Sequence, residues 1–168
     1  MKKFLALVMF WSCAALAADG SPDVLGVFDD WSAFMYKDES DLVCYMATEP
    51  SKSQGKYTRR DDVFLIVTHR PKDKAFDVVN VSAGYTYKKS SKPTFSVDNK
   101  KATNLVVSND TAWAKDADTD AKLVAAMKKG SNAVLKGTSA RGTVTTDTFS
   151  LKGFGKAYQA INKACGRE

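Results

Sequence analysis

The chain has 168 residues, a length that suits one domain with a substantial core. Its 25 lysine and arginine residues outnumber 19 aspartate and glutamate residues, which gives a net charge of +6 at pH 7. This excess permits weak attraction to anionic surfaces but excludes a dedicated nucleic-acid-binding protein, so no nucleic-acid partner is expected.

Residues 1–17 have the layout of a cleaved secretory signal. Two lysines follow Met1, residues 4–16 are almost wholly apolar, and small residues precede the expected cleavage site after Ala17. The apolar run is shorter than the roughly 20 residues that a bilayer span needs. Cleavage would leave a single domain, residues 18–168, with 23 basic against 19 acidic residues and no transmembrane span.

Two other interpretations of this segment stay open. Cys13 follows a poor lipoprotein box, because bulky Trp11 stands where a small residue is expected, so acylation of Cys13 is one alternative. An uncleaved membrane anchor is the other. No later segment approaches membrane-spanning length, and the mature protein is therefore expected to be soluble.

Signal cleavage also changes the cysteine count, because it removes one of the three cysteines and leaves Cys44 and Cys165. An even pair in an oxidising compartment predicts a disulfide. The chain-entropy model assigns about 4–5 kcal/mol to a closed loop of roughly 120 residues. The alternative is two separate buried thiols.

Most of the chain predicts β-strands, with residues 49–60 as a loop. The continuously apolar residues 63–67 predict a central strand covered on both faces, and Pro71 follows its end. Residues 76–87 alternate cleanly between apolar and polar positions. The full set of predicted strands is 27–36, 42–47, 63–67, 76–87, 94–97, 103–107, 131–138 and 143–151, the last two forming a hairpin.

Two short helices are also predicted. The first begins near Asp118 as its N-cap and ends before Gly130. The second spans about 155–164, and Cys165 continues its apolar face, so a disulfide to Cys44 would pin this helix to an early strand. The elements together predict a mostly-β fold, a β-sandwich with two short helices.

No catalytic set emerges from the residue pattern. The single histidine, His69, ends an apolar strand and is interpreted as a residue that hydrogen-bonds to a loop. One histidine and a disulfide-bonded cysteine pair cannot supply a zinc site, and no glycine-rich phosphate loop follows a strand. No metal and no cofactor are therefore expected. A hydrolase alternative would use the pairs Asp29-Asp30 and Asp61-Asp62, or Ser139 with Lys152.

Lysine pairs at 88–89, 100–101 and 128–129 occur in the same half of the chain as Tyr85, Tyr87 and Phe95. A basic surface with aromatic side chains can hold an anionic glycan, lipopolysaccharide or a lipid headgroup. The simpler interpretation is that these lysines keep the protein soluble and protect edge strands.

Several short stretches, in order along the chain, resemble the invasion-associated locus B family of secreted bacterial proteins. They are Asp30-Trp31, Cys44-Tyr45, residues 67–71, 82–85, Ala112-Trp113, 126–131, the most specific stretch 137–143, residues 147–154, and Cys165. The resemblance implies an immunoglobulin-like β-sandwich, a location in the periplasm or cell envelope of a Gram-negative bacterium, and agrees with a Cys44–Cys165 disulfide. It implies no established biochemical activity, and invasion is not carried over as a function.

Four residues are the candidates for binding. Arg141, beside Gly142 at a predicted hairpin tip, can clamp a carboxylate or phosphate, or else cap carbonyl groups of its own loop. Trp31, Trp113 and His69 are the others, although the two tryptophans are also large enough to organise a core. The preferred hypothesis is a non-enzymatic envelope protein that binds another envelope protein, a glycan or a lipid. The alternatives are a host-directed adhesion or invasion factor at the cell surface and a periplasmic hydrolase; the oligomeric state is left open.

Overall fold

Residues 21–38 and 41–167 are described by the structure, which is a computed structural model. The predicted signal segment, residues 1–17, lies outside the described residues. No helix in the described part of the chain is long and apolar enough to cross a bilayer.

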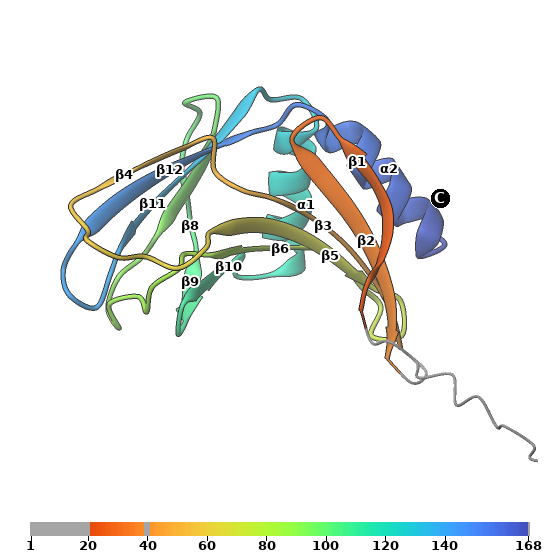
Figure 1. The fold of residues 1–168 in the computed structure, drawn as a ribbon, viewed down its shortest axis with the longest axis horizontal. Helices are drawn as coiled ribbons and strands as arrows, with labels where there is room; N and C mark the ends of the chain where they lie inside the picture. The colour runs from red at the N-terminus through yellow and green to blue at the C-terminus, as the bar shows by residue number, and fades with distance from the viewer. Residues whose placement is uncertain (1–20, 39–40, 168) are drawn as a thin grey trace, which may run out of the picture.

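Two antiparallel sheets form the fold (Figure 1). The larger sheet has the order β1-β2-β3-β5-β6-β10-β9, and the smaller sheet has the order β4-β12-β11-β7-β8. The larger sheet comprises β1 (Asp23–Phe28), β2 (Trp31–Asp38), β3 (Asp41–Thr48), β5 (Phe64–Arg70), β6 (Ala75–Ser82), β9 (Val106–Ser108) and β10 (Thr111–Trp113). The smaller sheet comprises β4 (Lys52–Gly55), β7 (Thr94–Val97), β8 (Thr103–Asn104), β11 (Asn132–Thr138) and β12 (Val144–Ser150).

Two helices pack on the larger sheet. Helix α1 (Ala117–Met127) lies against β6, and α2 (Phe154–Ala164) lies against β1, β2 and β3 (Figure 1). One continuous core contains buried side chains of both sheets and both helices. Its largest fully buried members are Trp31, Phe95, Phe149, Phe154, Met46, Leu65, Met127, Leu135 and Ile161. The prediction of a mostly-β, sandwich-like fold with two helices is confirmed, while its immunoglobulin-like character stays a prediction.

The predicted strand 27–36 is wrong, because a hairpin turn divides it. β1 and β2 pair through Phe28 and Trp31, and the two aspartates between them form the turn. Asp29 has a φ of 52°, a left-handed conformation that aspartate tolerates better than most residues. The turn therefore needs no glycine, and its sequence gives no strong signal.

The predicted loop 49–60 contains a strand that the sequence does not indicate. β4 pairs with β12 from Lys52–Thr148 to Gly55–Thr145, and all four of its residues are exposed. An edge strand with no buried face carries no apolar alternation. Backbone pairing alone defines it.

The predicted strand 76–87 ends at Ser82 in the structure. The chain bends at Gly84, and Tyr87 then bridges Ser139 of the other sheet. A Cβ atom at Gly84 would lie 2.1 Å from the Asp61 carbonyl oxygen, so only glycine fits this crossing. The alternation continues past the bend because Ala83 and Tyr87 remain buried after the backbone has left the sheet.

Smaller differences concern element ends and burial. Strand 103–107 is interrupted at buried Leu105, so that β8 belongs to the smaller sheet and β9 to the larger. β5 is buried on one face only, because Phe64 and Ile66 are half-buried on the other. α1 has Asp116, not Asp118, as its N-cap, with the Asp116 carboxylate accepting from the Thr119 N–H at 2.8 Å.

Candidate functional site

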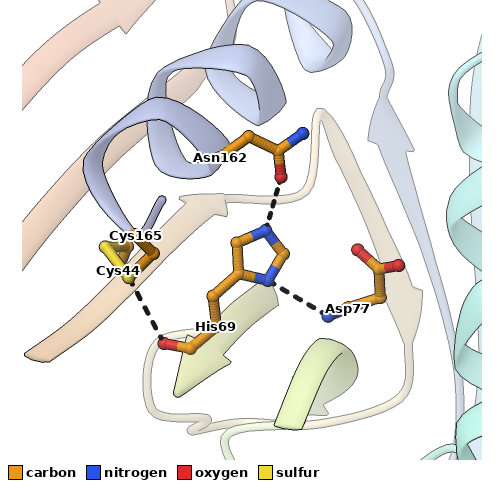
Figure 2. Close-up of a disulfide and its surroundings, with 5 residues drawn as sticks. All are labelled: Cys44, His69, Asp77, Asn162 and Cys165. Atoms are coloured by element: carbon orange, nitrogen blue, oxygen red, sulfur yellow. Dashed lines mark hydrogen bonds between the residues drawn. A yellow bond between two sulfur atoms is a disulfide. The ribbon is translucent and has the colours of Figure 1, made fainter. Parts of the chain in front are cut away.

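The predicted disulfide is present between Cys44 on β3 and Cys165 directly after α2. The two Cα atoms lie 6.0 Å apart, and both residues are buried. Figure 2 shows the bond beside His69, which pairs with Cys44 across the β3–β5 ladder. The disulfide ties the last helix to the middle of the larger sheet.

His69 is fully buried and makes two hydrogen bonds through its ring (Figure 2). The backbone N–H of Asp77 donates to Nδ1 at 3.1 Å. The proton therefore resides on Nε2, which donates to Oδ1 of Asn162 on α2 at 2.8 Å. Burial lowers the pKa of His69, so the ring stays neutral and holds α2 on the sheet rather than facing a ligand.

A charged network continues from this histidine to the C-terminal residues. The Asp77 carboxylate accepts a hydrogen bond from the Tyr158 hydroxyl at 2.7 Å and forms an ion pair with Arg167. Burial by itself raises the pKa of Asp77, but these partners outweigh it and the pKa is lowered. Burial and the Asp77 hydrogen bond together raise the pKa of Tyr158 to about 12. Both groups are thus fixed in one protonation state and act as structural contacts.

The two candidate tryptophans lie in different environments. Trp31 is fully buried, donates its indole N–H to the Ser150 carbonyl at 3.0 Å, and packs edge-on against Phe154. Trp113 is 36% exposed on β10, opposite exposed Val106 of β9. Trp31 is therefore inaccessible to a ligand, and Trp113 lies in a part of the larger sheet that none of the other candidates shares.

Arg141 lies at the tip of the β11–β12 hairpin. The turn is closed by bonds from Gly142 N–H to Ser139 O at 2.8 Å and from Ser139 N–H to Thr143 O at 2.9 Å. Gly142 has a φ of 86°, which favours glycine. The Arg141 side chain is exposed, and it makes no ion pair or hydrogen bond with any described residue. It is therefore available to a ligand.

Arg141 lines a cavity of about 610 Å³ that we call the basic pocket. Three segments meet here: residues 56–61 after β4, residues 84–86 after β6, and the β11–β12 hairpin. The lining residues are Lys56, Tyr57, Thr58, Arg59, Arg60, Asp61, Gly84, Tyr85, Thr86, Ser139, Ala140, Arg141, Thr143 and Thr145. Four of these are cationic and one is anionic.

A buried ion pair holds one of the lining residues of the basic pocket, Arg60, in place. Both terminal nitrogens of Arg60 bind the two Asp147 oxygens at 2.7 Å, and Arg60 Nε donates to the Ala83 carbonyl at 2.6 Å. The guanidinium also lies over two aromatic rings, 5.5 Å from the centre of Tyr57 and 4.9 Å from that of Tyr85. Although burial lowers the pKa of Arg60, its contacts with Asp147 raise it overall, so the guanidinium is charged.

Because Arg60 is paired with Asp147, three of the four cations that line the basic pocket remain without an ion-pair partner: Lys56, Arg59 and Arg141. All three are exposed, and none forms an ion pair with a described residue. Asp61 is the single carboxylate of the lining. The basic pocket therefore has a positive potential that suits a carboxylate or phosphate.

The residues of the hydrolase alternative do not converge. Ser139 is buried and its hydroxyl accepts from the Thr143 N–H at 3.2 Å, at the tip of the β11–β12 hairpin. Lys152 follows the opposite end of β12 and pairs with Asp29 at 3.2 Å. The seven paired residues between them correspond to about 20 Å along the strand. Within residues 21–38 and 41–167, no group of three histidine, cysteine or carboxylate side chains could hold a metal.

The remaining polar candidates lie elsewhere. Asp30 occupies the β1–β2 turn and Asp62 is exposed before β5. None of the lysine pairs 88–89, 100–101 and 128–129 lines the basic pocket. The other cations of the basic pocket were not predicted, although the segment Lys56-Tyr57-Thr58-Arg59-Arg60 is itself a basic and aromatic cluster. That cluster was interpreted only as a loop.

Comparison with known proteins gives one match. The model of the family described as invasion associated locus B (IalB) protein matches residues 31–162. No curated protein and no solved structure matches the chain. The match spans β2 to most of α2 and includes every residue of the basic pocket. The chain therefore belongs to the invasion associated locus B family.

Proposed function

We propose that this protein is exported to the bacterial envelope and acts there by binding an anionic ligand in the basic pocket, without catalysing a reaction. The observation that carries the proposal is the convergence of Lys56, Arg59 and Arg141 on one cavity. These cations come from two segments about 80 residues apart in sequence. Their meeting at one opening is a property of the fold.

The electrostatics of the opening favour an anion. Like charges that gather without partners repel one another and cost stability, so an arrangement of this kind is typical of a site where a ligand supplies the opposite charge. Arginine can bind a carboxylate or phosphate through two parallel hydrogen bonds, and lysine adds a compact charge. Asp61 offsets one of the three charges and leaves a net excess.

Export is supported by two independent features. The Cys44–Cys165 disulfide suits an oxidising compartment, and residues 1–17 have the layout of a secretory signal. A binding role rather than an enzymatic one agrees with the state of His69, which is buried, neutral and used by α2. It also agrees with the separation of Ser139 from Lys152 along the β11–β12 hairpin.

The proposal is tested by titrating the 15N-labelled mature protein with citrate and with phosphate while following backbone amide shifts. Shifts are expected in residues 56–61, 84–86 and 139–145, and they should be lost in the double variant Arg59→Ala, Arg141→Ala. The matched control is Lys100→Ala, Lys101→Ala, which removes the same charge from the exposed β7–β8 turn. Shifts that spread over all exposed lysines, or that survive in the Arg59 and Arg141 variant, would contradict the proposal.

A further inference from the structure

A second hollow adjoins the basic pocket. The neighbouring hollow has a volume of about 650 Å³ and is lined by Gly55, Lys56, Arg141, Gly142, Thr143 and Val144. Lys56, Arg141 and Thr143 line both spaces. Two cations therefore stand between two hollows and not at the bottom of one.

We propose that the ligand is an oligosaccharide of at least two sugar units that carries carboxylate or phosphate groups and lies across both hollows. This inference rests on the proposed function, because it names the ligand class of the same pocket. An anionic group of the oligosaccharide contacts Lys56 and Arg141, and the adjoining sugar units occupy the hollows on either side. A single small anion would meet these two cations and leave both hollows empty.

The lining suits sugar rings better than lipid chains. A sugar ring has an apolar C–H face and a rim of hydroxyl groups. Tyr57 is 40% exposed and offers an aromatic surface to such a face, while exposed Thr58 and Thr86 offer hydroxyl groups. Ala140 and Val144 are the aliphatic side chains among the lining residues of the two hollows, too few to cover an acyl chain.

The aromatic surface is held in place before the ligand arrives. Arg60 lies over the rings of Tyr57 and Tyr85, and Asp147 fixes its guanidinium. The Tyr85 hydroxyl is also hydrogen-bonded to Thr145 at 2.7 Å. A rigid ring loses little conformational freedom on binding, which favours recognition of a weakly binding, hydroxylated ligand.

A peptide is the main competing ligand, because β4 is an edge strand of the smaller sheet. A peptide added to β4 would run along Lys52–Gly55, whereas only Gly55 of that strand lines either hollow. The cations and Tyr57 lie beyond the end of β4. The lining therefore favours the oligosaccharide.

Isothermal titration calorimetry on the mature protein tests this inference with five probes: trigalacturonate, galacturonate, neutral galactotriose, triglutamate and the phosphorylated core oligosaccharide of fully deacylated lipopolysaccharide. We expect trigalacturonate or the phosphorylated core to bind at least about tenfold more tightly than galacturonate, galactotriose and triglutamate. Tighter binding of trigalacturonate identifies the anionic group as a carboxylate, and tighter binding of the phosphorylated core that is lost on its dephosphorylation identifies it as a phosphate.

Variants of Tyr57 separate the contribution of sugar contacts to binding from the contribution of the anionic group. Tyr57→Ala should weaken oligosaccharide binding about tenfold and leave the citrate-induced amide shifts at Arg141 intact, while Tyr57→Phe should retain oligosaccharide binding because it keeps the ring. Lys100→Ala is the control for a lost exposed charge.

The contrary results have distinct meanings. Triglutamate binding as tightly as the better of trigalacturonate and the phosphorylated core, or neither of these two binding more tightly than galacturonate, overturns the oligosaccharide inference and leaves the anion-binding function standing. Absence of binding by all five probes together with absence of citrate and phosphate shifts overturns both.

Discussion

Arg60 and Asp147 form an ion pair that differs from the others described in its burial. Their side chains are 5% and 0% exposed, whereas Lys152 and Asp29 are 74% and 32% exposed. A buried pair has already lost its hydration, so removing one partner leaves an uncompensated charge in the core. An exposed pair is replaced by water at little cost.

Asp147→Asn should therefore lower the free energy of unfolding by about 3 kcal/mol, because it keeps the shape of the side chain and leaves Arg60 unpaired. Asp29→Asn should lower it by less than about 1 kcal/mol, because the partner Lys152 is mostly in water. Urea denaturation followed by circular dichroism measures both variants. Equal losses in the two would show that burial does not determine the contribution of the Arg60–Asp147 pair.

Asp120 should make the free energy of unfolding depend on pH. This residue of α1 is 7% exposed, and its Oδ1 accepts the Val79 N–H at 2.7 Å. Burial raises the pKa of Asp120 to about 6; the Val79 hydrogen bond opposes the shift, and the charge of Asp77 adds to it. The folded protein thus holds a proton that the unfolded chain releases near pH 4. The stability that this proton contributes is complete below pH 4 and is lost as the pH rises through 6.

The variant Asp120→Asn cannot ionise but keeps an oxygen that can accept the Val79 N–H. Between pH 4 and pH 7, the unfolding free energy of the unmodified protein should fall by roughly 2 kcal/mol relative to that of Asp120→Asn. Urea denaturation of both proteins at pH 4, 5, 6 and 7 measures this difference. A difference that stays constant over this range would mean that Asp120 is already ionised at pH 4.

At the scale of elements, α2 is held by three kinds of contact that meet beside β3 and β5. Its apolar side chains pack in the core, Asn162 accepts from His69, and the disulfide follows its last turn (Figure 2). The disulfide spans 121 residues and so limits the unfolded chain strongly. The packing and the hydrogen bond stabilise the folded state directly.

The double variant Cys44→Ser, Cys165→Ser should lower the unfolding free energy by about 3–4 kcal/mol, since the entropic term is largest for long loops. Amide hydrogen exchange should become faster first in α2, residues 154–164, and less so in β11 and β12, which lie in the other sheet. Asn162→Ala, with the disulfide kept, is the comparison that removes only the hydrogen bond to His69. Uniform acceleration over the whole chain would show that the disulfide acts only on global unfolding, through the unfolded chain, and not on local opening of α2.

Some elements of this fold can be predicted from local sequence patterns and others cannot, for physical reasons. The β11–β12 hairpin was predicted to within a residue at either end, because its alternation and its turn at residues 140–142 are local features. The sequence does not indicate β4, because its residues are all exposed, and it predicts one strand over 27–36, because Asp29 can form a turn without glycine. Residues 83–87 were assigned to a strand because burial continues where the backbone pairing has stopped.

At the scale of the whole molecule, the basic pocket depends on how the two sheets are connected. Its lining comes from residues 56–61 and 84–86, which connect one sheet to the other, and from the β11–β12 hairpin. Arg141 was identified from its hairpin, but Lys56 and Arg59 were not, because β4 must pair with β12 before residues 56–61 come near the hairpin tip. The pairing of Gly55 with Thr145 brings these segments together. Sequence can identify the charged residues of such a site, whereas topology decides which of them act together.

The disulfide also links the fold to the compartment in which the chain folds. Cys44 and Cys165 are both buried, and the bond between them suits an oxidising compartment. The proposed export with cleavage after Ala17 would provide that environment and would remove Cys13, which could otherwise compete for either partner. A single disulfide isomer is then the expected product.

Intact mass spectrometry under non-reducing conditions, on protein recovered from its native host, should give the mass of residues 18–168 less two hydrogen atoms. Reduction should add two hydrogen atoms and nothing else, and the same chain expressed in a reducing cytoplasm without residues 1–17 should carry two free thiols. A mass that includes an acyl group on Cys13 would contradict cleavage after Ala17 and place the protein on a membrane. Two free thiols in the native product would contradict the oxidising compartment, and the buried pair would then have to be explained as an unreacted contact.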